Sequence, residues 1–181
     1  MNESNSNKSF LAIFAHPDDE AFGTGGLLAL TASRGHKTAL VTATRGEVGE
    51  ISDPALANPE NLGQVREQEL REAADVLGVS ELVILDYRDS GMAGTEDNEH
   101  LKALAQADAN EVIGQLVGII RRLKPDVVVT FDRKGLRRRD KNRWKGLDET
   151  NSTVSLRASQ STRRTHNFHQ TMWIPGIPGF F

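Results

Sequence analysis

The chain has 181 residues, of which 38% are hydrophobic and 26% charged, with a formal net charge of −3 and no cysteine. This length favours one domain that buries a core of its own, and the lack of cysteine excludes disulfides and thiolate metal ligands. No apolar run approaches the roughly 20 residues that cross a bilayer, and the polar N-terminus has no apolar signal core, so we expect a cytoplasmic protein with no membrane partner.

The predicted elements alternate between strands and helices. Such alternation favours an α/β fold with a Rossmann-like, doubly wound, mostly parallel sheet. Loop 43–61 is unusually long for a compact domain, and long loops are often functional. Strands are predicted over 10–15, 38–42, 82–85 and 126–131, helices over 25–33, 63–77 and 110–123, and a short helical turn over 101–105.

The first predicted strand ends in a polar turn, His16-Pro17-Asp18-Asp19-Glu20. Reactive groups of open α/β folds lie at the carboxyl ends of parallel strands. His16 and Asp19 are three residues apart around a proline-bent turn, so both side chains can reach one cation. Imidazole nitrogen and carboxylate oxygen suit zinc or another divalent metal, and Asp18 can stay off the metal and act on a bound water. The alternative is that these acids only cap the next helix, where negative charge is favourable.

Two further polar residues stand near predicted strand or helix ends. Glu47 opens the long loop near the expected crevice, although it could equally be a solvated carboxylate. Arg66 falls in the first turn of a predicted helix, where cations are unfavourable. That position suggests a role in gripping a substrate oxygen or a carboxylate, and the alternative is an ordinary surface arginine.

Several motifs together resemble one known family over about residues 9–135. The run Ala15-His16-Pro17-Asp18-Asp19-Glu20 is similar to the signature of the LmbE/PIG-L family of metal-dependent N-deacetylases, which act on N-acetylglucosamine-type amides. Other family-like pieces follow in the family's order, and Arg88-Asp89-Ser90-Gly91-Met92 resembles the branch that deacetylates glucosaminyl-inositol precursors and related thiol conjugates. These pieces are Thr44-Arg45-Gly46-Glu47, Arg66-Glu67-Gln68-Glu69-Leu70, Arg88 to Met92, and Pro125 to Asp132.

The resemblance implies amide hydrolysis at a zinc or similar divalent-metal site. His16 and Asp19 would bind the metal and Asp18 would act as the general base. A small-molecule amino sugar would be held by Arg66, by Asp89 through sugar hydroxyls, by Met92 against a ring face, and by Glu47. For Asp89 the plain alternative is a turn-stabilising carboxylate beside Gly91.

The family's third metal ligand is missing from its usual place. A catalytic zinc normally takes three protein ligands, and the family supplies the third from a His-x-x-His-like element shortly after the 126–131 strand. Here that place has no histidine, and the one His-x-x-His is His166-Asn167-Phe168-His169. We therefore take His169 as the candidate third ligand, against the entropy of ordering a long loop.

The character of the chain changes after residue 136. Through Asp132 there are 11 Lys and Arg against 22 Asp and Glu, and after it 11 against 3. We predict a deacetylase-like domain over 1–136, with the sheet truncated or altered at its C-terminus, and a basic, poorly structured segment over 137–181.

Three explanations for this change are open: a divergent ending that uses His166 and His169, a basic arm on a core without activity, or a shift of reading frame near Gly135. Nucleic-acid binding by the basic segment ranks last because it lacks regularly spaced aromatic residues. Assembly into a homo-oligomer is left open.

Overall fold

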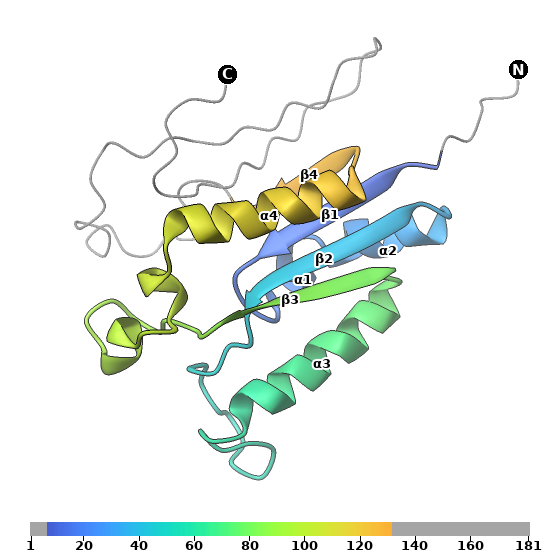
Figure 1. The fold of residues 1–181 in the computed structure, drawn as a ribbon. Helices are drawn as coiled ribbons and strands as arrows, with labels where there is room; N and C mark the ends of the chain where they lie inside the picture. The colour runs from blue at the N-terminus through green and yellow to red at the C-terminus, as the bar shows by residue number, and fades with distance from the viewer. Residues whose placement is uncertain (1–6, 132–181) are drawn as a thin grey trace, which may run out of the picture.

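A computed structural model describes residues 7–131 of the chain (Figure 1). The predicted boundary at residue 136, the basic segment 137–181 and His169 lie outside these residues. Within them, no helix is both long and apolar enough to cross a bilayer. In chain order the elements are β1 Ser9–Phe14, α1 Asp19–Gly23, α2 Gly25–Ser33, β2 Lys37–Thr44, α3 Leu62–Leu77, β3 Glu81–Tyr87, two short 3-10 helices Glu96–Glu99 and Leu104–Gln106, α4 Ala109–Leu123 and β4 Val127–Thr130.

Four parallel strands form the sheet in the order β3-β2-β1-β4. The predicted α/β architecture is thereby confirmed. Ile13 of β1, for example, lies opposite Val41 of β2 and Thr130 of β4. Since all four strands run the same way, their carboxyl ends meet at one edge of the sheet, where the polar loops begin.

Helices cover both faces of the sheet, with α4 on one side and α2 and α3 on the other (Figure 1). The alternation of side chains along a strand explains the two cores. Alternate residues of β1 pack against Leu28 of α2 and Leu70 of α3, and the others pack against Leu116 of α4. β1 is buried on both faces, which is why it reads as an unbroken apolar run.

Two differences from the sequence-based prediction matter for the site. α1 was not predicted, because five residues that include a glycine give no helical periodicity. β2 and β3 each extend two residues further than expected, to Thr44 and Tyr87. The extension of β3 brings Arg88 and Asp89 directly to the carboxyl edge of the sheet.

Candidate functional site

The turn after β1 is fixed to the end of β2. Thr44 is fully buried, and both its backbone N–H and its hydroxyl donate to the carbonyl oxygen of Ala15, at 3.0 and 2.9 Å. These two bonds hold the backbone immediately before His16. The imidazole is thereby placed at the carboxyl edge of the sheet, as the sequence predicted.

His16 lies between two carboxylates. Its Nδ1 is 3.6 Å from Asp19 Oδ2 and its Nε2 is 3.4 Å from Asp89 Oδ1. Asp19 Oδ2 also accepts the backbone N–H of His16 at 2.9 Å. The contact with Asp19, followed by that with Asp89, raises the pKa of His16 to about 10. Without a metal, the imidazole is therefore a cation held by two anions.

The contact between His16 and Asp19 fits a divalent metal. Nitrogen and oxygen ligands about 2.0–2.2 Å from zinc in tetrahedral geometry are roughly 3.4 Å apart, close to the 3.6 Å between Nδ1 and Oδ2. A metal on Nδ1 would take the place of a proton. Asp89, which faces the other ring nitrogen, Nε2, would fix the orientation of the ring. Within residues 7–131 no group of three His, Asp or Glu side chains could hold a metal, so the His16–Asp19 pair would need a further ligand from elsewhere.

Asp18 forms its ion pair with Arg66 rather than with His16. Nη2 of Arg66 donates to Asp18 Oδ2 at 2.8 Å and to the carbonyl oxygen of Pro17 at 2.7 Å. The Asp18 side chain is half exposed, so its carboxylate is open to solvent beside the His16–Asp19 pair. The arginine predicted from the first turn of α3 therefore lies against a carboxylate.

Glu20 is a site residue that the sequence did not single out. It is 1% exposed, and its Oε2 accepts the backbone N–H of Asp18 at 3.0 Å. Burial raises its pKa, although backbone N–H donors partly offset that effect. The sequence signal was ambiguous, because an acid in the first turn of a helix is normally an exposed, dipole-stabilising residue.

Glu47 and Asp89 join the loops after β2 and β3. Glu47 Oε2 accepts the backbone N–H of Asp89 at 2.9 Å, and Asp89 Oδ1 accepts that of Gly91 at 2.9 Å. Asp89 is 7% exposed. Burial alone would raise its pKa, but the contacts with His16 and with backbone N–H groups outweigh burial and lower it. Asp89 thus remains an anion next to His16.

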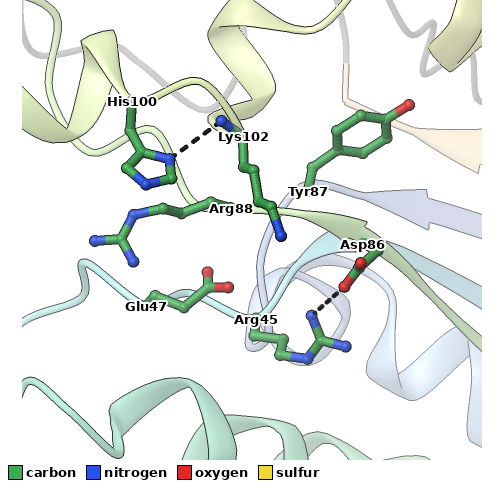
Figure 2. A pocket seen from close by; sticks show the side chains of 7 residues that line it. All are labelled: Arg45, Glu47, Asp86, Tyr87, Arg88, His100 and Lys102. Carbon is green, nitrogen blue, oxygen red and sulfur yellow. Dashed lines mark hydrogen bonds and ion pairs between the residues drawn. The ribbon is translucent and has the colours of Figure 1, made fainter.

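A polar pocket of about 240 Å³ lies on the other side of Glu47 (Figure 2). Figure 2 shows the side chains of Glu47 and Lys102 extending into it from opposite loops. Arg45 at its edge is fixed by Asp86 at 3.0 Å and Glu67 at 2.6 Å. Glu47, which accepts the backbone N–H of Asp89, links this pocket to the His16–Asp89 contact. Its lining consists of Arg45, Glu47, Asp86, Tyr87, Arg88, His100 and Lys102.

The structure brings most of the predicted site residues into one set of contacts. His16 touches Asp19 and Asp89, Asp89 is bonded to Glu47, and Asp18 is paired with Arg66 in the neighbouring turn. Met92 lies apart on the loop after β3, and its side chain is 53% exposed.

Solved structures with the same fold include deacetylases. N,N'-diacetylchitobiose deacetylase from Pyrococcus horikoshii, in complex with an inhibitor, is 30% identical with a TM-score of 0.54, over 69% of this chain and 41% of that one. A deacetylase of teicoplanin biosynthesis is 25% identical with a TM-score of 0.51, over 68% and 58%. A 4-carboxy-2-hydroxymuconate hydratase, 23% identical with a TM-score of 0.53, shares the fold alone, so the fold by itself does not decide the reaction.

Curated relatives are more similar in sequence. The protein described as 1D-myo-inositol 2-acetamido-2-deoxy-alpha-D-glucopyranoside deacetylase from Acidothermus cellulolyticus is 43% identical over 71% of this chain and 47% of its own length. The protein of the same description from Salinispora arenicola is 42% identical over 71% and 44%. The chain thus spans just under half the length of these relatives.

The family described as PIG-L, GlcNAc-PI de-N-acetylase, matches residues 11–142. This range includes the whole cluster around His16 and confirms the resemblance drawn from the sequence motifs. It covers well over half of the chain, and the chain therefore belongs to the PIG-L family.

Proposed function

We propose that the chain is a metal-dependent N-deacetylase that removes an acetyl group from an N-acetylglucosamine-type amide, such as a glucosaminyl-inositol or a thiol-pathway precursor. The observation that carries this proposal is the pairing of His16 Nδ1 with Asp19 Oδ2 at 3.6 Å, next to a carboxylate, Asp18, that is not part of the pair. The PIG-L family is metal-dependent, and the descriptions of the relatives name an amino-sugar deacetylase.

We infer that His16 and Asp19 hold the metal, with zinc as the candidate ion and His169 as the candidate third ligand. A divalent metal in such a site polarises the amide carbonyl and lowers the pKa of bound water. Asp89 would keep the His16 ring in the orientation that leaves Nδ1 free for the metal. His169 lies outside the described residues, so its part in the site remains a proposal from the sequence.

Asp18 is the candidate general base. Its carboxylate would take the proton from the attacking water and return it to the departing amine. The base has to lie beside the metal ligands without being one of them, and the pairing with Arg66 is consistent with that arrangement.

The polar pocket beside Glu47 is the candidate position for the hydroxyl-rich remainder of the substrate. Its lining combines ammonium, guanidinium and carboxylate groups, which are donors and acceptors for sugar or polyol hydroxyls. Met92, exposed on the neighbouring loop, is the candidate apolar contact with a ring face. Arg66 and Asp89, expected from the family resemblance to hold substrate, already have partners within the protein.

The second candidate is a deacetylase-like protein with impaired catalysis. The observation that favours it is that residues 7–131 contain no group of three side chains that could hold a metal. Such a protein would bind an amino sugar in the polar pocket but hydrolyse it slowly. In either case we propose a small-molecule substrate, and a cytoplasmic location stays a prediction from the sequence.

Metal content and amine release together distinguish the two candidates. The purified full chain is dialysed, its zinc content is measured, and amine release is followed with N-acetylglucosaminyl-inositol. One equivalent of zinc with turnover supports the deacetylase, and both should be lost in His16→Ala. Substrate binding without zinc or amine release would contradict the deacetylase proposal and support the impaired protein.

A further inference from the structure

Asp18 adopts a backbone conformation that disfavours a side chain. Its φ is 94° and its ψ −29°, and within residues 7–131 Lys124 is the one other non-glycine residue with positive φ. Such conformations are unfavourable for a residue with a side chain and persist where the surroundings impose them. The residue proposed as the base is therefore held in its position by other groups.

The first of these groups is the carboxyl of Glu20. It accepts the backbone N–H of Asp18 at 3.0 Å and is 1% exposed. Acidic side chains are rarely fully buried, and burying one is costly unless its bonds compensate. Because Glu20 lies in the first turn of α1, the bond fixes the Asp18 peptide at the entry to that helix.

The second group is the guanidinium of Arg66. A single nitrogen, Nη2, donates both to the carbonyl oxygen of Pro17 and to the carboxylate of Asp18. Arg66 thus fixes the peptide before Asp18 and the direction of its side chain. Charge-assisted bonds of this kind are stronger than neutral ones.

Glycines in the long loop leave the room that this guanidinium occupies. A Cβ atom on Gly49 would lie 2.8 Å from Nη1 of Arg66, and one on Gly46 would lie 3.2 Å from its Nε. Gly46 also has φ +70°. The backbone of loop 45–61 therefore packs directly against Arg66 and keeps its guanidinium in contact with the Asp18 carboxylate.

We propose that Glu20 and Arg66 are positioning residues that hold Asp18 in its left-handed conformation and direct its carboxylate beside the His16–Asp19 pair. This inference rests on the proposed function insofar as Asp18 is the base. It gives Arg66 a partner in the protein's own turn in addition to any contact with substrate. It also gives the buried Glu20 a role that a helix-capping acid would not have.

Amide hydrogen exchange in the full chain tests the Glu20 half of the arrangement. We expect the Asp18 amide to be protected, to lose about tenfold or more of its protection in Glu20→Met, and to keep most of it in Glu20→Gln, which retains an acceptor. Amides of Leu11 and Ile13 in β1 report whether each variant is folded. Glu69→Met, on the exposed face of α3, is the matched control. Unchanged Asp18 exchange in a folded Glu20→Met protein would overturn the proposal.

A comparison of glycine with alanine at position 18 tests the strain. Both variants lose the bond to Arg66, but only glycine adopts φ 94° freely. We expect the unfolding equilibrium constant of Asp18→Gly to be smaller than that of Asp18→Ala by about fivefold or more. Equal stability would mean that Asp18 is not held in a strained conformation.

Kinetics at saturating substrate test the positioning role of Arg66 apart from any part it has in substrate binding. We expect Arg66→Met to lower kcat about 10- to 100-fold, whatever its effect on KM, and Arg66→Lys to restore part of kcat. An unchanged kcat in Arg66→Met would overturn the assignment of Arg66. If the wild-type chain releases no amine, the proposed function fails, whereas the exchange and stability measurements still decide the inference.

Discussion

His16 is the residue on which the site depends, because its two ring nitrogens face different carboxylates. Asp19 lies in the same turn and Asp89 comes from the loop after β3. A metal bound to the imidazole would also be bound by Asp19. Asp89 is the more deeply buried of the two carboxylates, and it would orient the imidazole ring. Asp18, two residues from His16, forms its ion pair with Arg66 and with neither ring nitrogen. The three aspartates thus have three different surroundings.

These surroundings predict different effects for substitutions of neighbouring residues. Asp19→Ala should abolish zinc binding, whereas Asp18→Asn should keep zinc and lower kcat by about 10²- to 10⁴-fold, the usual contribution of a general base. Zinc content after dialysis and amine release are measured on the same samples. Asp75→Asn, on an exposed turn of α3, is the control. Normal turnover in Asp18→Asn would refute its role as the base.

The sequence singled out His16, Asp18 and Asp19, but not the contacts of Asp18 with Arg66 and Glu20. An apolar run that ends in His-Pro-Asp-Asp marks a strand end, and parallel strands place that end at the crevice. The contact of Arg66 with Asp18 depends on how α3 packs against the long loop, and that packing leaves no local pattern. The burial of Glu20 is equally invisible, since its position in a first helical turn predicts exposure.

At the level of elements, β4 is joined to β1 by a local set of bonds at their amino ends. Asp126 Oδ2 accepts the backbone N–H of Ser9 at 2.8 Å and its hydroxyl at 3.0 Å, and Asp126 N–H donates back to the Ser9 carbonyl. The Ser9 N–H bond, followed by the hydroxyl bond, lowers the pKa of Asp126, with Lys8 adding to the effect. A lowered pKa in the folded chain implies a pH-dependent contribution to stability.

The sign of this contribution follows from the direction of the shift. A carboxylate with a lowered pKa stabilises the fold above its unfolded pKa of about 4, and the stabilisation is lost as the pH falls through the folded pKa. We expect Asp126→Ala to reduce the unfolding free energy by about 0.5–1 kcal/mol at pH 7, because the group is partly exposed. Urea titrations at pH 7 and pH 3 measure it, and an equal difference at both pH values would contradict the linkage.

α3 ends at a glycine that packs directly against α2. Gly78 has φ +71°, and a Cβ there would lie 2.7 Å from that of Ala32. Gly118, in the exposed part of α4, has no neighbouring atom within 4 Å of such a Cβ and an ordinary helical φ. We expect Gly78→Ala to lower the unfolding free energy by about 1 kcal/mol or more and Gly118→Ala to raise it by about 0.5–1 kcal/mol. Urea midpoints measure both, and the same sign for both would contradict this account.

Element types followed from the sequence more closely than element lengths. α3 was predicted within one residue, because its apolar stripe and Gly78 mark its face and its end. β3 was underestimated because it lies at the edge of the sheet that the structure describes, so Asp86 is exposed, Tyr87 is only half buried, and the two give no apolar run. α1 depends on the Asp18 turn, which is held by tertiary contacts that periodicity does not record.

At the level of the whole molecule, the sheet brings the predicted site residues to one edge, but residues 7–131 contain no group of three side chains that could hold a metal. The loops after β1, β2 and β3 all contribute to the His16 cluster, so these three strands carry the part of the site that the structure describes. β4 ends at Thr130, at the same edge of the sheet. A zinc site at His16 and Asp19 would need a third ligand, and we propose that it comes from the segment after residue 131, which lies outside the described residues.

This need makes the origin of the third ligand testable in the full chain. We expect His169→Ala to weaken zinc binding by about tenfold or more in competition with a chelator, since a catalytic zinc normally takes three protein ligands. His36→Ala is the control, because His36 lies at the amino end of β2, away from the site, where its Nδ1 accepts the Lys8 N–H. His16→Ala shows how far zinc affinity falls when one proposed ligand is lost. If zinc affinity is the same in His169→Ala as in the wild type and falls in His16→Ala, His169 is not a ligand, and the impaired-protein proposal gains support, because the described residues would then hold the ion with two donors.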